Sequence, residues 1–456
     1  MDSATKHNHS TYISRRVERP FDLVDLHAKD PIHYPHLLQS SAHGRFDILF
    51  AHPGDSLALE PSGGLSGPAD LQPATNDFLE NLDHWWSALQ TETGTTDSLP
   101  FTGGWFLYLG YELAGQIEPR LQLPRPEGLL PVAIATRFFS AIVYDHKRHI
   151  TTIIAEAGHE DLIRQIANDI ADLPVSPEND ENNVRPEKIT EAPSGQYLRA
   201  IARILEYIRE GDVFQVNLSR RWDMSAQGPV DIPLLYKKLR QHNPSPYSGI
   251  ARWEDAAIIS SSPERLVRVQ GKTVETRPVA GTRPRSRIES TDIAYSRELL
   301  AHPKERAEHI MLIDLERNDL GKICVPGSVQ VDEFMVLESC AHVHHIVSNI
   351  KGRLRHDVKP GQVIRAVFPG GTITGCPKVR CMEIIAELEQ DARDAYTGSM
   401  GYLNRDGNMD LNILIRSMVT FGNTVQFRAG AGIVTDSVPA AELEETRAKA
   451  LGMIRA

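Results

Sequence analysis

The sequence predicts a mixed fold of helices and strands, divided into two domains. Apolar runs bounded by turn residues, as at 46–51, are typical of strands. Apolar residues at three- and four-residue spacing, as at 197–208, indicate amphipathic helices. Residues 174–193 are rich in Pro, Glu, Asn and Asp and bury too little apolar surface to order themselves, so they form a predicted linker. We therefore expect an N-terminal domain over residues 1–190 and a C-terminal domain over residues 191–456.

The composition restricts the partners and the compartment. The chain has 456 residues, 41% of them hydrophobic and 24% charged, which suffices for a large core. A formal net charge of −11 argues against nucleic acid and anionic membranes as partners, because both require a basic surface. The most apolar long stretch, at 129–144, is interrupted by Pro131 and Arg137, and no signal peptide is visible, so we expect no membrane segment. The four cysteines lack metal-site or disulfide-framework spacing, which indicates the reducing cytoplasm.

Several strands are expected in the N-terminal half. The run at 46–51 ends at Pro53, and two further runs lie at 133–144 and 149–155. The segment 103–112 places two glycines before an aromatic-rich run, which predicts a strand with close backbone approach and aromatic side chains in the core.

After the linker, a helix and a strand follow in order. Tyr197 and Ile208 bound the apolar face of the helix, and Gly211 is its expected C-cap. The next run alternates apolar and polar residues, which places Gln215 and Asn217 on one face of a strand, together with Ser219. Another strand is expected at 256–259. The arginine cluster at 276–285 is typical either of a solvated face or of a site that binds carboxylates.

The segment 368–378, Phe-Pro-Gly-Gly-Thr-Ile-Thr-Gly-Cys-Pro-Lys, is a glycine-rich loop that leads into a helix. Gly370, Gly371 and Gly375 permit positive φ and close approach to a ligand, and Pro377 suits a first helical turn. Such a loop either binds an anion at the helix N-terminus or is a tight connection without a ligand. It does not match the phosphate-binding pattern of nucleotide-binding proteins.

Two pairs of glutamates have the same spacing on two expected helices. Glu305 and Glu308 follow Pro303, while Glu442 and Glu445 lie on a helix that begins near residue 439. Each pair alone is typical of a solvated helix face. Together, four carboxylates could meet around Mg²⁺, which prefers oxygen ligands. Zn²⁺ is disfavoured, because no cysteine or carboxylate spacing completes a tetrahedral site with the histidines at 342–345.

These motifs resemble those of the chorismate-utilising enzymes, most closely the aminodeoxychorismate synthase component I branch. The matching strings cover nearly all of residues 192–450 in family order. They are Phe214-Gln-Val-Asn-Leu-Ser, Ser262-Pro-Glu-Arg, Pro278-Val-Ala-Gly-Thr-Arg, Lys304-Glu-Arg-Ala-Glu-His, Leu315-Glu-Arg-Asn-Asp-Leu-Gly, Val343-His-His-Ile-Val-Ser, the glycine-rich loop, Gly398-Ser-Met-Gly-Tyr, Ile415-Arg-Ser, Arg428-Ala-Gly-Ala-Gly-Ile and Glu442-Leu-Glu-Glu-Thr.

The resemblance implies an α+β fold like that of anthranilate synthase component I, a sandwich of two antiparallel β-sheets enclosed by helices. It implies a regulatory-type α+β domain in the N-terminal half and a chorismate-binding catalytic domain after it. In anthranilate synthases the N-terminal region holds feedback tryptophan. Gln39 and Ser248 depart from that pattern and argue against tryptophan inhibition here.

The resemblance also implies roles for individual residues. Glu308 and Glu445 would bind Mg²⁺, supported by Glu305 and Glu442, and the ion would hold the ring carboxylate of chorismate. Glu264 would be the general acid that protonates the departing ring hydroxyl, with His345 and Thr282 lining the reacting face. The expected substrate-binding residues are Tyr396, Arg416, Gly430, Gly432, Lys449, Gly371 and Thr372.

Finally, the resemblance implies the reaction. Gln215 stands where the relatives that add water to chorismate, the isochorismate and salicylate synthases, have a lysine base. A neutral amide cannot deprotonate water, so ammonia is the expected nucleophile. The chain contains no glutaminase motif, so we expect a separate glutamine amidotransferase subunit. The glycine-rich loop and the Gln215 strand favour 4-amino-4-deoxychorismate as product, for 4-aminobenzoate and folate synthesis. Ala280, where many aminodeoxychorismate synthases have a nucleophilic lysine, is typical of anthranilate synthases. A non-catalytic amino-acid-binding subunit is a third reading.

Overall fold

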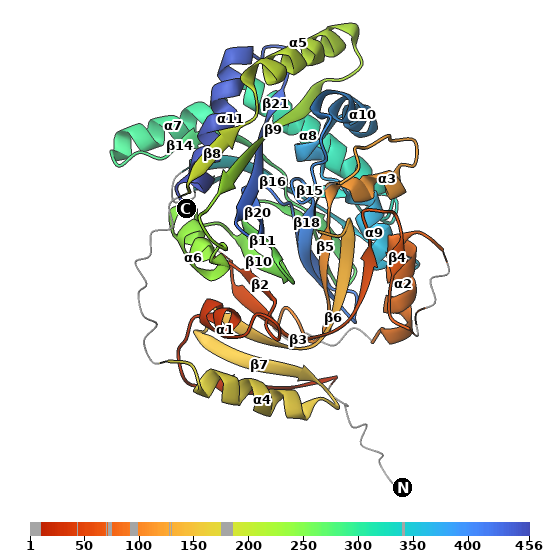
Figure 1. The fold of residues 1–456 in the computed structure, drawn as a ribbon. Helices are drawn as coiled ribbons and strands as arrows, with labels where there is room; N and C mark the ends of the chain where they lie inside the picture. The colour runs from red at the N-terminus through yellow and green to blue at the C-terminus, as the bar shows by residue number, and fades with distance from the viewer. Residues whose placement is uncertain are drawn as a thin grey trace.

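The computed structural model describes residues 11–42, 44–69, 71, 75–91, 99–126, 128, 130–174, 186–339 and 343–456. Figure 1 shows two β-sheets with helices packed on their outer faces. All strand pairings between the named strands are antiparallel, and the predicted α+β sandwich is confirmed.

The first sheet combines strands from both halves of the chain. In order of pairing, its strands are β1 (Tyr12–Val17), β7 (Ile150–Glu156), β6 (Ala133–Asp145), β3 (Phe46–Leu59), β2 (His36–Gln39), β10 (Tyr247–Trp253), β11 (Ala256–Ser262), β20 (Ser417–Phe421), β21 (Thr424–Ile433), β9 (Gln215–Ser225) and β8 (Lys188–Glu191). Two short strands extend it: β4 (Leu65–Ser66) pairs with β3, and β17 (Gly375–Cys376) pairs with β9.

The second sheet shares strand β6 with the first. Residues 133–138 of β6 pair with β5, whereas residues 140–145 pair with β7, so the sheets diverge along this long strand. From β6 the order is β5 (Gly104–Leu109), β18 (Ser399–Asn404), β19 (Met409–Asn412), β12 (Arg265–Gln270), β13 (Thr273–Thr276) and β16 (Val343–Arg353). β14 (Val279–Pro284) and β15 (Gln330–Ser339) both pair with β16.

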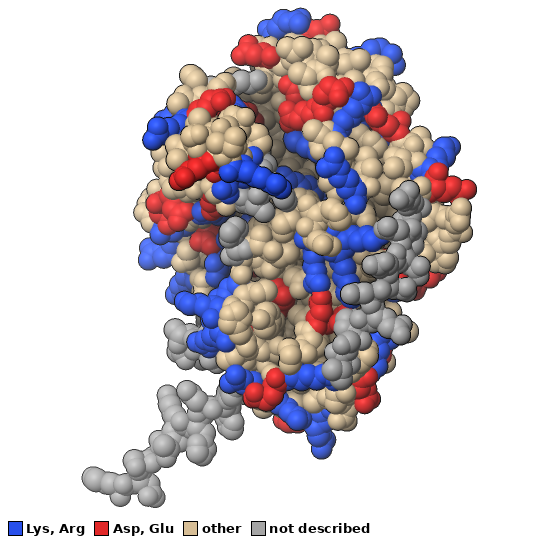
Figure 2. Space-filling view, turned by 90° about the vertical axis from the view of Figure 1, so that its left-hand side faces the viewer, with Lys and Arg blue, Asp and Glu red and all other residues tan. Residues whose placement is uncertain are grey.

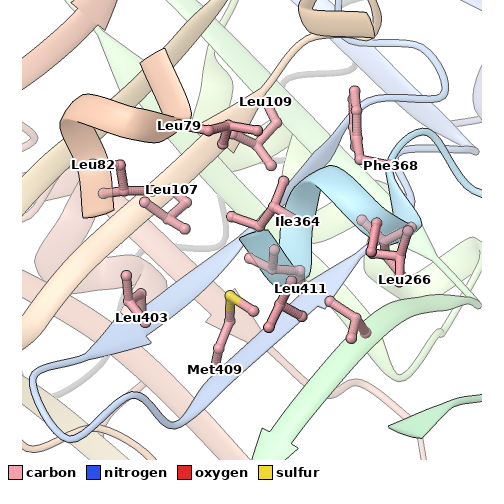
Figure 3. Packing of buried hydrophobic residues seen from close by; sticks show 14 of the residues in the cluster. Leu79, Leu82, Leu107, Leu109, Leu266, Ile364, Phe368, Leu403, Met409 and Leu411 are labelled. Atoms are coloured by element: carbon pink, nitrogen blue, oxygen red, sulfur yellow. The ribbon is translucent and has the colours of Figure 1, made fainter. Parts of the chain in front are cut away.

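The core follows from the alternation of side chains along these strands. In β5, Trp105 and Leu107 face the layer of α2 (Phe78–Leu89) and α9 (Pro360–Val367), as Figure 3 shows for Leu107. Phe106 and Tyr108 point the other way, into the apolar layer between the sheets. Successive strand residues point to opposite faces, so an all-apolar run such as β5 must be covered on both sides.

The remaining helices cover the outer faces and carry part of the candidate site. They are α1 (Leu23–Lys29), η1 (Tyr111–Leu113), α3 (Ala114–Ile117), α4 (Glu160–Ala171), α5 (Ser194–Glu210), α6 (Ile232–His242), α7 (Glu289–Ala301), α8 (Pro303–Gly321), η2 (Gly371–Ile373), α10 (Lys378–Glu389) and α11 (Pro439–Ile454). No helix among the described residues combines the length and apolarity that crossing a membrane requires.

Most predicted elements are present, with two differences: β3 extends beyond its expected end, and residues 188–191 of the predicted linker form β8, which pairs with β9. The expected helix after the linker is α5, and Gly211 caps it at φ 84°. β3 does not end at Pro53 but continues to Leu59 through an irregularity in its register. The strand pairs β2–β10 and β5–β18 join the two halves of the chain, and the division near residue 190 stays a prediction. Residues 175–185 of the predicted linker lie outside the described part of the chain.

Candidate active site

The candidate site is built around the first residues of β9. Gln215 is buried, and its Nε2 donates a 2.9 Å hydrogen bond to Glu308 Oε1 on α8. Gly432, on the neighbouring strand β21, provides the room, because a Cβ there would overlap Nε2 of Gln215. The structure thus brings Gln215, Glu308 and Gly432 into one place, although they are far apart in sequence.

The glycine-rich loop lies against the same strand. Residues 371–373 form a single 3₁₀ turn, and Gly375 then pairs with β9 at φ 129°. A Cβ at Gly375 would overlap the carbonyl oxygen of Gln215, so this position requires glycine. The helix expected after the loop is α10, which begins at Lys378 with Pro377 as its N-cap rather than in its first turn. The short β17 pairing therefore separates the glycine turn from the helix N-terminus.

Glu264, the predicted general acid, is buried between β11 and β12. Burial, augmented by the nearby Glu316 carboxylate, raises the pKa of Glu264 to about 8, although Thr372 and Arg416 act to lower it. The Thr372 side chain is near enough to influence the Glu264 carboxyl, yet Glu264 Oε1 and Thr372 Oγ1 are both buried without a hydrogen-bond partner among the described residues. A carboxyl group with this pKa is mostly protonated at neutral pH, as a general acid must be.

Arg416 acts electrostatically on His345 as well as on Glu264. His345 Nδ1 is 3.3 Å from the carbonyl oxygen of Gly281, which requires the proton on Nδ1. Burial and the Arg416 charge lower the pKa of His345 to about 4, so the ring is neutral. Thr282 pairs with His345 across β14 and β16, but its side chain lies outside the described atoms. Arg416 itself has a left-handed backbone, at φ 51°.

Tyr396 and Gly430 form a second part of the site. The Tyr396 hydroxyl would lie 2.6 Å from a Cβ at Gly430, and Asn217 Oδ1 would lie 2.8 Å from it. Only glycine therefore lets both polar groups approach the β21 backbone. Burial raises the pKa of Tyr396 to about 12, so the hydroxyl keeps its proton and can donate a hydrogen bond.

Helix α11 brings its charged residues to the same strand. Lys449 Nζ donates a 3.0 Å hydrogen bond to the carbonyl oxygen of Gly430 and forms a 2.8 Å ion pair with Glu445. Burial raises the pKa of the Tyr197 phenol, and Tyr396, Glu442 and Glu445 add to it, so both carboxylates are within electrostatic reach of a residue of α5. About half of the Glu445 side chain is exposed (49%).

The four predicted metal ligands have the right chemistry for Mg²⁺. They offer carboxylate oxygens, which hard divalent cations prefer. Gln215 donates to Glu308 Oε1, Lys449 to Glu445 Oε1, and Arg283 Nη1 lies 3.2 Å from Glu305 Oε1, so a bound cation would share these carboxylates with their present donors. In the part of the chain that the structure describes, no three His, Cys, Asp or Glu side chains are already gathered as a metal site. Their assembly around Mg²⁺ stays a prediction.

Residues of the arginine cluster, and His344, pair with acidic side chains of the protein itself. Arg277 is paired with Glu333 and Arg283 with Glu298, at 2.5 Å and 3.0 Å. Figure 2 shows acidic and basic side chains interspersed over one face of the molecule. His344 lies 3.1 Å from an oxygen of Asp292, and His342 is outside the described residues.

A cavity of about 870 Å³ lies where the two halves of the chain meet, lined by Gln39 and Ser248 among other residues. Gln39 Nε2 donates to Asp47 Oδ2 at 2.9 Å, and its Oε1 accepts from Arg240 Nη1 at 2.8 Å. Ser248 Oγ is 2.9 Å from Ser41 Oγ. The two residues that depart from the tryptophan-binding pattern are thus bonded within the protein.

Sequence reasoning did not single out Glu316, a buried acid behind the glycine-rich loop. Burial, together with the neighbouring Asp319, raises the pKa of Glu316 to about 7. A Cβ at Gly371 would lie 3.3 Å from Glu316 Oε1, and Glu316 in turn raises the pKa of Glu264. The signal was available, because Glu316 follows Glu308 by eight residues and shares its helix face.

Comparison with known proteins agrees with this architecture. The chain is 38% identical over 443 residues to aminodeoxychorismate synthase component 1 of Bacillus subtilis (strain 168), covering 92% of this chain and 91% of the relative. It is 39% identical over 415 residues to anthranilate synthase component 1 of Streptomyces coelicolor, covering 85% and 79%. These similar identities span two different reactions.

Solved structures match as well. The crystal structure of anthranilate synthase component I from Streptococcus pneumoniae TIGR4 superposes with a TM-score of 0.81 at 32% identity, covering 90% of this chain and 92% of that one. The menaquinone-specific isochorismate synthase from Escherichia coli shares the fold, with a TM-score of 0.75 at 18% identity, 97% of this chain and 94% of that one. The family model for chorismate binding enzymes matches residues 34–455, and this protein belongs to the family of chorismate binding enzymes.

Proposed function

We propose that the protein aminates chorismate with ammonia and forms 4-amino-4-deoxychorismate. The observation that carries this proposal is the buried amide of Gln215, bonded to Glu308 at 2.9 Å. An amide has no basic nitrogen that could take a proton from water, whereas ammonia attacks through its own lone pair. The amide therefore supports amination over the addition of water.

In the proposed reaction, Glu264 protonates the leaving group. Its pKa of about 8 leaves the carboxyl mostly protonated at neutral pH. As the ring C–O bond breaks, the hydroxyl takes this proton and departs as water, while the C–N bond to ammonia forms. The new ammonium then gives up one proton, which restores the Glu264 carboxyl. Chorismate and ammonia thus yield the amino compound and water, without an oxidant or reductant.

The other residues of the site would bind and orient the dianionic substrate. Arg416 and Lys449 supply positive charge, Tyr396 a hydroxyl donor, and the β21 backbone a close-fitting surface at residues 430–432. Gly371 and Thr372 close the side next to Glu264. Mg²⁺, held by Glu308 and Glu445 with Glu305 and Glu442 in support, would neutralise the ring carboxylate when bound.

The choice of product rests on local sequence. The glycine-rich loop at 370–375 and the Gln215 strand resemble the aminodeoxychorismate branch, and the Bacillus subtilis relative carries that name. The second candidate is anthranilate formation with release of pyruvate. Ala280 favours it, since this buried residue on β14 offers no amine for covalent attack on the ring. The Streptomyces coelicolor relative is named for that reaction.

The ammonia would come from a separate glutamine amidotransferase subunit, since the chain has no glutaminase motif. The nucleophile can be tested by incubating the protein with chorismate and Mg²⁺ in isotopically labelled water, with and without ammonium. We expect consumption of chorismate only with ammonium, and no label in the product. A labelled, hydroxylated isomer of chorismate formed without ammonium would contradict the proposal.

A further inference from the structure

A buried ion cluster lies behind the proposed substrate site. The Glu389 carboxylate accepts hydrogen bonds from Arg393 Nη2 at 2.6 Å and Nε at 2.9 Å, and from Arg428 Nη2 at 2.9 Å. Ser219 of β9 donates its backbone N–H to the same carboxylate at 2.8 Å. All four residues are buried, and although burial opposes it, the two guanidinium groups lower the pKa of Glu389. We call these residues the Glu389 cluster.

Arg393 connects this cluster to two backbone segments of the site. Its Nη2 donates to the carbonyl oxygen of Asn217 on β9 at 2.7 Å, and its Nη1 donates to that of Ile373 in the glycine-rich loop at 3.2 Å. Its guanidinium lies 5.5 Å from the centroid of the Tyr396 ring and 4.9 Å from that of Tyr111. One side chain thus contacts the loop, the strand and the tyrosine proposed to bind substrate.

The N-terminal half of the chain completes this arrangement. Glu112 accepts the backbone N–H of Arg393 at 2.8 Å and that of Asp394 at 3.1 Å. The ring of Tyr111, from the same half, lies against the Arg393 guanidinium. The turn that carries Tyr396 is therefore fixed from both halves of the molecule.

We propose that Arg393 is a positioning residue that sets where the Tyr396 hydroxyl lies over Gly430 and thereby the affinity for chorismate. This proposal rests on the proposed function in one respect, namely that Tyr396 contacts the substrate. Arg393 itself touches no substrate, because its donors are directed to Glu389, Asn217, Ile373 and Thr397. Only a planar fork with several donors spans these partners, so lysine cannot replace it.

The test compares Arg393→Lys with a matched control, Arg137→Lys. Arg137 is also buried and bonds Glu156 and the carbonyl oxygen of Gly104, and its hydrogen bonds and ring contacts within the described residues are all made outside the proposed site. Both variants lose a buried fork, so both should melt at lower temperature. We expect Arg393→Lys alone to raise the KM and the calorimetric Kd for chorismate at least about tenfold, with a smaller effect on kcat.

Two further variants keep the outcome decisive. Tyr111→Leu removes the stacked ring but leaves every charge, so it should fold and still raise the KM. In the Tyr396→Phe background, Arg393→Lys should add little, because the hydroxyl it positions is absent. Unchanged chorismate affinity in Tyr111→Leu, or fully additive effects with Tyr396→Phe, would overturn the proposal. The product is identified in a separate experiment. Formation of anthranilate would refute the proposed reaction, but the effect of Arg393 on the affinity for chorismate could still be tested.

Discussion

Replacing Gly432 by alanine tests how the site is built, because the three atoms nearest to a Cβ there all belong to the Gln215 side chain. The amide nitrogen would have to retreat by about 1 Å to reach an ordinary van der Waals separation. We expect that movement to lengthen its 2.9 Å hydrogen bond to Glu308, and beyond about 3.5 Å no hydrogen bond remains. Losing a hydrogen bond to a charged group costs about 1.5–3 kcal/mol. We therefore expect kcat/KM to fall by roughly ten- to a hundredfold.

The assay is chorismate consumption with Mg²⁺ and ammonium, with thermal unfolding measured in parallel. Gly228→Ala is the matched control, since a Cβ there has open space around it, and it should leave activity unchanged. In a Gln215→Ala background, Gly432→Ala should cost little, because the group it displaces is gone. If Gly432→Ala keeps full activity, or if its effect is the same with and without Gln215, the reasoning is refuted.

Three further predictions follow from the same geometry. At constant free ammonia, kcat/KM should fall as the pH rises through about 8, because the raised pKa of Glu264 means that its active, protonated form is lost there. Glu264→Gln should remove this fall in the pH profile, and a fall that persists in the variant would disprove the role of Glu264 as general acid. Glu308→Gln and Glu445→Gln should fold normally yet lose at least about a hundredfold in turnover, roughly 2.7 kcal/mol. Full activity of both variants, or activity of the unsubstituted protein that excess chelator leaves unchanged, would exclude the metal site. The purified chain should use ammonium but not glutamine until a glutaminase subunit is added, and glutamine-dependent turnover by the chain alone would show that ammonia has an internal source.

The sequence predicted those parts of the fold whose signal is local. The amphipathic face that ends at Gly211 and the alternation from Gln215 each depend on neighbouring residues, and both elements are present as α5 and β9. The glycine-rich loop was expected to lead directly into a helix, yet Gly375 first pairs with β9. That pairing joins residues about 160 apart, and no local pattern reports it.

The same distinction applies to the site. Spacing on one helix pointed to Glu305 and Glu308, but it could not show that Gln215 donates to Glu308 or that Lys449 pairs with Glu445. The Glu389 cluster escaped notice for a related reason. A lone glutamate on a helix and arginines on a turn and a strand are ordinary surface residues until the tertiary fold buries them together.

The central claim is tested most directly by the identity of the product. The protein is mixed with chorismate, Mg²⁺ and ammonium in the absence of any lyase, and products are followed by mass spectrometry, by anthranilate fluorescence and by pyruvate release. The account predicts 4-amino-4-deoxychorismate, which retains its enolpyruvyl group, without fluorescence and without pyruvate. Immediate anthranilate fluorescence with stoichiometric pyruvate would contradict it and would make Ala280 the residue that reveals the reaction.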